Sequence, residues 1–425
     1  MNRRGFLQLA ASTPLLLASG PAPSTAAVAD ELRSPDPLGL MLPPGFRARE
    51  IARASVAVAG TDYVWPAYPD GGATFATPDS GWIYVANSEV ADRGGGVSAV
   101  RFGADGSIVD AYAIGSGTSR NCAGGVTPWR TWLTCEEVED GEVYECDPEG
   151  ERPAEVRPAL GRFSHEAVAC DPAGRALYLT EDAEFGRLYR FTPVVWGDLG
   201  DGRLEVARTD ELGVVSWLPV ESPDATAYAG GEGIAYHDGQ VVFTTKPDQR
   251  VRSYDTHTET MTVLYEPSSL PEISGPDNVA FSSTGDLYVC EDASTDQELV
   301  LITGAGRRVP VLRLAGHEGS ELAGPAFDPS GTRLYISSQR GAGGGGVTYE
   351  ISGPFARLAA PLTTTTTSAR VSPTTGNAAG RPDDTGGAHA DDDSILPVVG
   401  AAGGVALLAL GGLAWLRTRR GTEAS

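Results

Sequence analysis

Four side chains that could bind metal ions recur at equivalent places in successive repeats of this sequence. They are Cys122, Glu166, Glu232 and Asp277, and each stands near the start of a short hydrophobic strand. Carboxylates bind hard cations such as calcium and ferric iron, whereas a thiolate suits iron better than calcium. If the fold brings the four together, they predict a metal site. The alternative interpretation is that acidic residues at strand starts only cap turns, as aspartate often does.

The repeat that positions these side chains is a hydrophobic strand that ends in polar, usually acidic residues. Successive copies lie about 45 to 50 residues apart, except for one gap that is longer by roughly one loop. A period of this length, with turn-bounded strands and almost no helical pattern, is typical of a β-propeller with one four-stranded blade per repeat. The sequence therefore predicts an all-β, six-bladed β-propeller. The six copies are 81–89, 130–137, 175–182, 239–246, 285–292 and 332–339.

A propeller would bring the four candidate ligands together, because its innermost strands surround a central channel. Counting back eleven or twelve residues from the aligned position of each repeat gives one column of strand starts. We expect this column to face the channel and to form an axial metal site. Its members, in chain order, are Gly72, Cys122, Glu166, Glu232, Asp277 and Gly324.

The start of the chain is predicted to be an export signal rather than part of the fold. Arg3 and Arg4 precede a mildly apolar stretch, and small residues at 26–29 could support cleavage. This pattern predicts a twin-arginine signal over residues 1–29, with the twin-arginine translocase as a transient partner. The alternative is an ordinary secretory signal. Twin-arginine export carries folded proteins and agrees with a metal site installed before export.

The end of the chain is predicted to anchor the protein in the cell membrane. Residues 395–416 are uncharged and long enough to cross a bilayer, although a buried core helix is the alternative. Arginines within 417–425 place that tail in the cytoplasm. Residues 361–394 are rich in Thr, Pro, Gly and Asp and predict a disordered stalk. We therefore expect one propeller domain, residues 40–358, held outside the cytoplasm.

Charge and cysteine content narrow the choice of partners. The net charge is −24, from 56 acidic and 32 basic residues, which argues against binding nucleic acid or adsorbing to anionic lipid. A phosphorylated substrate would need metal cations to reverse the local field. The chain has five cysteines, so at most two disulfides can form. We expect a monomer. The pairing of Cys135, Cys146, Cys170 and Cys290 in disulfides is left open. Cys135, Cys170 and Cys290 lie within predicted strands, which favours buried thiols at these three positions.

Several motifs of this chain resemble those of PhoX-type alkaline phosphatases. The most specific is NCAGGVTPWRTWLTCEE at 121–137, and the others occur in the expected order across roughly 60–350. The resemblance implies a six-bladed propeller with a buried cluster of ferric iron and calcium ions that hydrolyses small phosphate monoesters. The other motifs are DGGATF with WIYVANSE, GRFSHEAVACD with YLTED, GPDNVAF with LYVCED, and AGPAFDPSGTRLYISSQ.

The resemblance also implies roles for individual residues. Cys122 would be the thiolate between two ferric ions, with Glu166 and Glu232 as carboxylates on the iron side. Glu136 and Glu137 would bind calcium. A metal-bound oxygen species, and no protein side chain, would be the nucleophile. Asp277 would be a further calcium ligand. The less specific candidate metal ligands are Asn87, Glu89, Asp182 and Glu291.

Two departures from the family pattern keep other functions open. The family carries an arginine just before the glutamate that corresponds to Glu232, whereas this chain has Gly230-Gly231 there. In the second blade, Arg130 replaces the glycine of the family motif TPWGTW and is a candidate substrate contact. One alternative is a calcium-dependent, lactonase-like hydrolase using Glu232, Asp277 and Asn278, against which the axial cysteine argues. The other is a non-catalytic surface-binding propeller with structural metals, which the missing arginine and the stalk favour.

Overall fold

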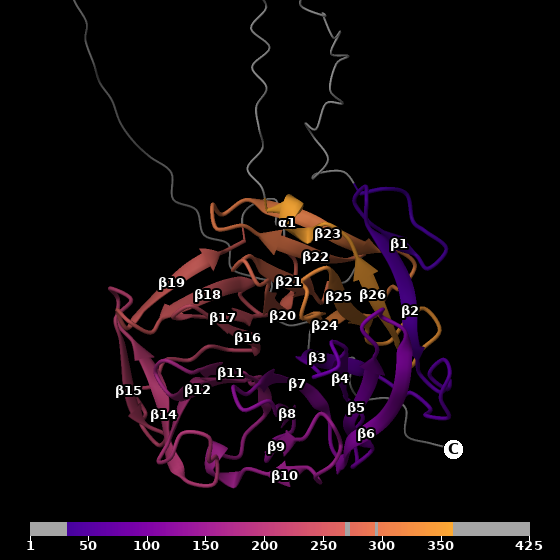
Figure 1. The fold of residues 1–425 in the computed structure, drawn as a ribbon. Coiled ribbons are helices and arrows are strands. Elements are labelled where there is room, and N and C mark those ends of the chain that lie inside the picture. Colours follow the sequence, from indigo (N-terminus) through magenta and orange to yellow (C-terminus); the bar gives the residue numbers. More distant parts are fainter. Residues whose placement is uncertain (1–31, 268–272, 294–295, 360–425) are drawn as a thin grey trace, which may run out of the picture. The chain divides into compact units, whose positions relative to one another are not determined.

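The computed structural model describes residues 32–267, 273–293 and 296–359. Within these ranges the chain forms six antiparallel sheets that radiate from a central axis, as Figure 1 shows. The predicted all-β, six-bladed propeller is therefore confirmed. Each blade begins with an inner strand beside the axis and continues outward through consecutive hairpins.

The strands of the blades follow the repeats of the sequence. Blade 1 contains β3 (Pro69–Ala76), β4 (Trp82–Ser88), β5 (Gly95–Phe102) and β6 (Ile108–Thr118). Blade 2 contains β7 (Asn121–Val126), β8 (Trp132–Glu136), β9 (Val143–Cys146) and β10 (Glu155–Val156). Blade 3 contains β11 (His165–Asp171), β12 (Ala176–Glu181), β13 (Leu188–Pro193), β14 (Gly202–Thr209) and β15 (Val215–Pro219).

The second half of the propeller is built in the same way. Blade 4 contains β16 (Gly231–His237), β17 (Gln240–Thr245), β18 (Arg250–Asp255) and β19 (Thr260–Tyr265). Blade 5 contains β20 (Pro276–Phe281), β21 (Leu287–Glu291), β22 (Gln297–Ile302) and β23 (Arg308–Leu314). Blade 6 contains β24 (Leu322–Phe327), β25 (Arg333–Ser338) and β26 (Val347–Ser352). The short helices are the 3-10 helix η1 (Pro158–Leu160) and α1 (Phe355–Leu358).

The N-terminal segment closes the propeller. Strand β2 (Arg47–Arg53) pairs with β26 and supplies the fourth strand of blade 6. Strand β1 (Leu40–Met41) pairs with β23 and adds a fifth strand to blade 5. Closure by a strand from the other end of the chain joins the first and last repeats.

The single long gap between repeats has a structural cause. Blade 3 carries a fifth strand, β15, on its outer edge, and the chain then needs a further loop to reach β16. The sequence interval between blades 3 and 4 is longer for this reason, and no blade is added.

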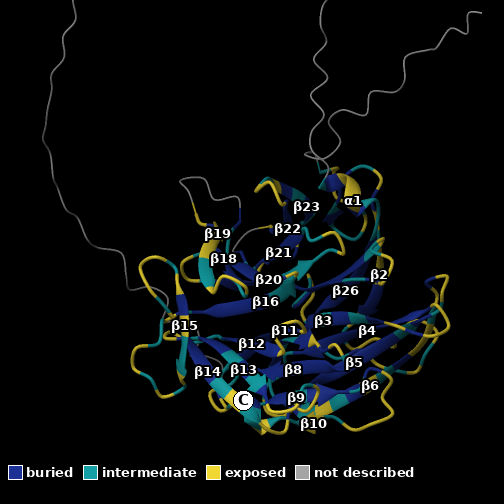
Figure 2. Cartoon of the chain, turned by 60° about the vertical axis from the view of Figure 1, so that its left-hand side comes forward, coloured by how far each residue is buried: buried dark blue, intermediate teal, exposed yellow. Residues whose placement is uncertain are grey.

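Apolar side chains from the middle strands fill the space between neighbouring blades. Figure 2 shows these strands as buried and the connecting loops as largely exposed. At the junction of blades 1 and 6, the rings of Tyr84 and Tyr335 stack with centroids 4.6 Å apart, and Trp82 donates a hydrogen bond to the Tyr335 hydroxyl. The cysteines belong to this packing: all five thiols are free, and only Cys122 is partly exposed. The expected burial of Cys135, Cys170 and Cys290 is confirmed.

The backbones of neighbouring inner strands approach each other so closely at the axis that two positions require glycine. Gly324, in β24, has a φ of +63°, and a Cβ atom there would lie 2.3 Å from the carbonyl oxygen of Asp70 in β3. A Cβ on Gly71 would lie 2.4 Å from the Cα of Ala123 in β7. Any larger residue at these two places would push inner strands apart, because the neighbouring atoms are backbone.

The predicted signal (1–29), stalk (361–394), membrane span (395–416) and cytoplasmic tail (417–425) lie outside the described residues. Among the residues that are described, no helix is long and apolar enough to cross a membrane.

Candidate metal centre

The six inner strands share one irregularity, and it builds the site. Each has a shift in register at the same point of its pairing with the second strand of the blade, for example between Asn121 and Gly124 in β7. A β-bulge of this kind adds one residue and re-aims side chains, which is why bulges often occur beside functional sites. We call the residues at the bulge the bulge ring: Asp70, Cys122, Glu166, Glu232, Asp277 and Gly324.

Five of these six positions agree with the column predicted from the repeats, and the first does not. The sequence alignment placed Gly72 in the column, but the structure places Asp70 there. The reason is the length of the first hairpin. Beyond the bulge, β3 and β4 pair over five positions, from Gly72 to Ala76, whereas β7 and β8 pair over three. Counting back a fixed number of residues therefore misses by two in blade 1.

A second ring of polar side chains follows the second strands. Its members share one backbone contact, because each N–H donates to the carbonyl oxygen of the residue just before the inner strand of the same blade. In blade 6 the carbonyl is that of Glu321. We call this set the strand-end ring: Glu89, Glu137, Asp182, Lys246, Asp292 and Gln339.

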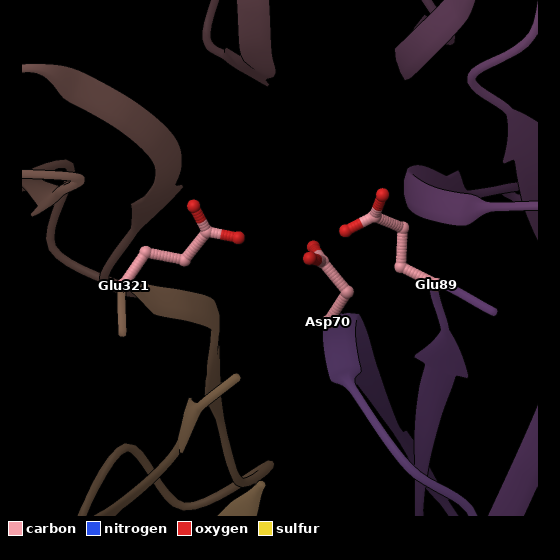
Figure 3. A group of neighbouring side chains, drawn as sticks. All are labelled: Asp70, Glu89 and Glu321. Atoms are coloured by element: carbon pink, nitrogen blue, oxygen red, sulfur yellow. The ribbon is translucent and has the colours of Figure 1, made fainter. Parts of the chain in front are cut away.

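The two rings bring carboxylates from different blades close together. Among the described residues there are three groups of three carboxylates in which each member offers an oxygen within 4.8 Å of those of the other two. In the group drawn in Figure 3, Asp70 and Glu89 project side by side from blade 1, and Glu321 points toward them from blade 6. Glu321 was not predicted, because it precedes its strand and does not fall in the repeat column. The other groups are Glu166, Glu232 and Asp277, and Asp277, Asp292 and Glu321.

Cys122 and Glu166 form the contact that best indicates a cation site. The Cys122 thiol donates to Oε1 of Glu166 over 3.2 Å, while Oε2 of Glu166 is buried without a hydrogen-bond partner. Burial, and then the charges of Glu232 and Asp277, raise the pKa of Glu166 well above its ordinary value. Burial, followed by Asp70 and Glu166, likewise raises the pKa of Cys122. A buried carboxylate oxygen that lacks a partner is costly, and a metal ion would satisfy it.

Amide side chains hold two members of the bulge ring in place. Gln339 Nε2 donates to Oδ2 of Asp70 and to Oε2 of Glu89, over 2.5 and 2.8 Å. Asn278 Nδ2 donates to Oδ1 of Asp277 over 2.8 Å. These contacts orient carboxylates without neutralising their charge, which is what ligands of a metal ion require from their neighbours.

Three predicted ligands have structural partners instead and are not brought to the rings. Glu136 accepts hydrogen bonds from the N–H groups of Ser119 and Glu142. Glu291 does the same in blade 5, with Ser274 and Glu298. Asn87 donates to the carbonyl oxygens of Cys122 and Ala123 and accepts from the indole of Trp132. These side chains brace the loops and strands beside the axis.

The predicted substrate contact Arg130 lies beyond the end of β7 that is farther from the bulge ring. It is in the turn between β7 and β8, beyond Val126, whereas Cys122 is near the start of β7. Its guanidinium donates to the carbonyl oxygen of Ala76. The arginines beside the strand-end ring are Arg120, which pairs with Glu89 over 3.5 Å, and Arg340, which pairs with Glu321 over 3.3 Å.

The charge of the axial site is strongly negative. Among the described residues, its cationic side chains are Lys246, Arg120 and Arg340. Like charges this close raise each other's pKa and destabilise the folded protein unless cations compensate them. Oxygen donors in this number suit calcium, and the addition of a thiol suits iron. The nine carboxylates are Asp70, Glu89, Glu137, Glu166, Asp182, Glu232, Asp277, Asp292 and Glu321.

The metal-free protein is expected to lose stability as the pH rises through neutrality. Burial, and then Glu89 and Asp182, raise the pKa of Glu137 from 4.5 to about 8. Between these two values the folded protein holds a proton that the unfolded chain has released, so the free energy of unfolding falls with increasing pH. Thermal unfolding of chelated protein between pH 5 and 8.5 should show a falling midpoint. Protein loaded with calcium should not show this decline, and a flat profile without metal would contradict the prediction.

The fold and the axial carboxylates define a class: a six-bladed β-propeller with an acidic axial site suited to metal ions. The family model for alkaline phosphatase PhoX matches residues 70–152, 139–262 and 239–342. The chain therefore belongs to the PhoX alkaline phosphatase family, and the resemblance inferred from the motifs is confirmed. The matched residues include both rings. No curated protein sequence matches the chain.

Solved structures with a similar fold are distant in sequence. A protein of unknown function from Bacteroides thetaiotaomicron is 11% identical, with a TM-score of 0.50, over 72% of this chain and 76% of that chain. A gluconolactonase from Xanthomonas campestris is 15% identical, with a TM-score of 0.45, over 77% and 98%. Virginiamycin B lyase from Staphylococcus aureus is 12% identical, with a TM-score of 0.43, over 72% and 99%.

Proposed function

We propose that this protein hydrolyses phosphate monoesters at an axial cluster of ferric iron and calcium ions. The observation that carries the proposal is the pair Cys122–Glu166 in the bulge ring, because it adds a thiol and a carboxylate oxygen without a partner to an otherwise all-oxygen site. Membership of the PhoX alkaline phosphatase family supports the reaction class. The axial cysteine argues against a lactonase-like centre built only from carboxylate and amide oxygens.

The described side chains would divide into an iron-binding set, a calcium-binding set and a pair of arginines that binds the substrate. Cys122, Glu166 and Glu232 would hold iron. Asp70, Glu89 and Glu321 form an all-carboxylate group that suits calcium. Metal ions bound there would supply Lewis acidity for the phosphoryl group and lower the pKa of water.

The two arginines at the strand-end ring would bind the substrate. Arg120 and Arg340 each pair with one carboxylate of the calcium group, Glu89 and Glu321 respectively, and both side chains are about two-fifths exposed. A guanidinium in this position can exchange a carboxylate partner for a phosphate oxygen, because it presents several N–H donors in a rigid plane. The missing arginine before Glu232 would thus be compensated from blades 2 and 6.

The full-length protein should cleave p-nitrophenyl phosphate at alkaline pH and contain both iron and calcium. Phosphoryl transfer needs positive charge around the non-bridging oxygens, and in this acidic site only metal ions can supply enough of it. Removal of calcium with a chelator should abolish activity, and added calcium should restore it. Phosphodiesters and lactones should react slowly or not at all. Lactone turnover without monoesterase activity would move the preference to the lactonase-like alternative, and metal binding without turnover would favour a binding propeller.

A further inference from the structure

Lys246 is the only lysine in the sequence, and it stands in the strand-end ring. The equivalent positions of the other blades hold four carboxylates and one glutamine. Its ammonium nitrogen lies 3.1 Å from Oε1 of Glu232, 3.0 Å from Oδ2 of Asp277 and 3.2 Å from Oδ2 of Asp292. A single cationic group therefore contacts three carboxylates, contributed by blades 4 and 5.

The contacts of Lys246 leave it no free donor for a substrate. An ammonium group has three N–H donors, and the three carboxylates account for all of them. Burial alone would lower the pKa of Lys246, but Asp277, Glu232 and Asp292 raise it well above the ordinary lysine value. The side chain is thus a permanent positive charge held among acids, and its geometry is that of a counter-ion.

The ammonium also lies where two carboxylate groups meet. Asp277 belongs both to the group with Glu166 and Glu232 and to the group with Asp292 and Glu321. Its Oδ2 faces Lys246 and its Oδ1 accepts from Asn278, so both oxygens are occupied. Asp277 was predicted to bind calcium, but in this chain its first partner is the lysine. In the group Asp70–Glu89–Glu321, by contrast, Arg120 and Arg340 each pair with a single carboxylate, at the edge of the group.

We propose that Lys246 takes the place of one metal ion at the junction of blades 4 and 5, so that Asp277 and Asp292 bind the protein's own cation. This inference rests on the proposed metal centre and refines it. Metal ions would be held by the side chains of blades 6, 1, 2 and 3 together with Glu232, while Asp277 and Asp292 of blade 5 are neutralised internally. Removing the ammonium should then open an additional cation site.

The test compares bound calcium in full-length wild-type protein, Lys246→Glu and Lys246→Gln. Glutamate matches the acidic members of the ring, whereas glutamine removes the charge without adding a carboxylate. After loading with calcium chloride and desalting, Lys246→Glu should hold about one more calcium ion per chain than the wild type. Its metal-free form should unfold at a lower temperature, and calcium should raise its midpoint more than that of the wild type. Lys246→Gln should show the same changes to a smaller extent.

The matched control is Arg203→Glu, which makes the same charge change at an exposed side chain that pairs with the buried Glu205 in blade 3. It should bind as much calcium as the wild type. Equal calcium in wild type and both Lys246 variants would overturn the inference, even if the wild type contains iron and calcium as proposed. Metal in the Lys246→Glu variant but none in the wild type would support the inference and refute the metal-dependent function. Extra calcium in Arg203→Glu would show a nonspecific charge effect and would also overturn the inference.

Discussion

Replacing Cys122 by serine is expected to remove bound iron and to lower monoesterase activity by several orders of magnitude. The Cys122 thiol is the only sulfur in the bulge ring, and it contacts the Glu166 carboxylate over 3.2 Å. Metal binding must displace the thiol proton, because the thiolate is the ligand. A serine hydroxyl keeps its proton at neutral pH and binds iron weakly. Loss of the metal removes both the charge that stabilises the transition state and the activated nucleophile.

Three measurements on the Cys122→Ser variant should change together: iron content, any thiolate-to-iron absorption and turnover of p-nitrophenyl phosphate. Calcium content and the fold should be largely kept. Cys135→Ala is the matched control, because Cys135 is a fully buried thiol in β8 that packs in the core. It should retain iron and lose at most the stability expected for a small cavity. The reverse pattern, with Cys135 needed for iron and Cys122 dispensable, would contradict the assignment of the bulge ring.

The propeller could be predicted because its repeat signal comes from the second strand of each blade. That strand is buried on both faces, so its hydrophobic run is nearly continuous, as in β4, β12 and β25. The closing strand β2 has no such signal: it is polar at an exposed edge, and its partner β26 comes from the other end of the propeller's sequence. Pairing between residues so far apart in sequence leaves no local pattern from which it could be inferred.

The candidate site was predictable where the repeat spacing holds and not elsewhere. Cys122, Glu166, Glu232 and Asp277 were found because their hairpins have similar lengths, and Asp70 was missed because its hairpin is longer. Asp70, an acidic residue followed by the small residues 71–73, is the signal that could have corrected the alignment of blade 1 with the other repeats. Neighbouring side chains along an extended chain point to opposite sides, so only one of Glu136 and Glu137, at the end of β8, can face the axis. The sequence alone could not show which of the two does so.

Lys246 shows a further limit of repeat-based inference. Ligand types were sought in the columns, and a cation among acids was not interpreted as part of the site. Its role depends on three contacts from two blades, and only the closed propeller brings these together. Glu321 was missed for a related reason, because it enters the site from the residue before a strand.

Glu166→Gln is expected to have opposite effects on the metal-free and the metal-loaded protein. The wild-type carboxyl is buried and its pKa is raised, so the folded metal-free protein holds a proton there that the unfolded chain loses at lower pH. The free energy of unfolding of the wild type therefore falls as the pH rises above the ordinary glutamate value, and glutamine removes this contribution. Chelated Glu166→Gln should match the wild type near pH 4 and be more stable at alkaline pH.

With metal present the sign should reverse. Glutamine keeps the shape of the side chain but removes a charged ligand from the group with Glu232 and Asp277, so bound metal and activity should both decrease. Loss of several kcal/mol of charge stabilisation corresponds to roughly a 10³-fold lower rate. Metal analysis, calcium-dependent unfolding midpoints and p-nitrophenyl phosphate turnover measure these effects. A variant that is less stable without metal and as active as the wild type with it would exclude Glu166 from the metal centre.

Glu136→Gln provides the comparison that separates a ligand from a structural carboxylate. Glu136 is buried, as Glu166 is, but its two oxygens accept hydrogen bonds from the N–H groups of Ser119 and Glu142. Glutamine can replace only one of these acceptors, so we expect a loss of about 1 to 3 kcal/mol in stability, with or without metal. Metal content and turnover should stay near the wild-type values below the unfolding temperature. Because both substitutions replace one buried carboxyl group by an amide, a metal-dependent change of sign in Glu166→Gln alone would locate the cation at the bulge ring.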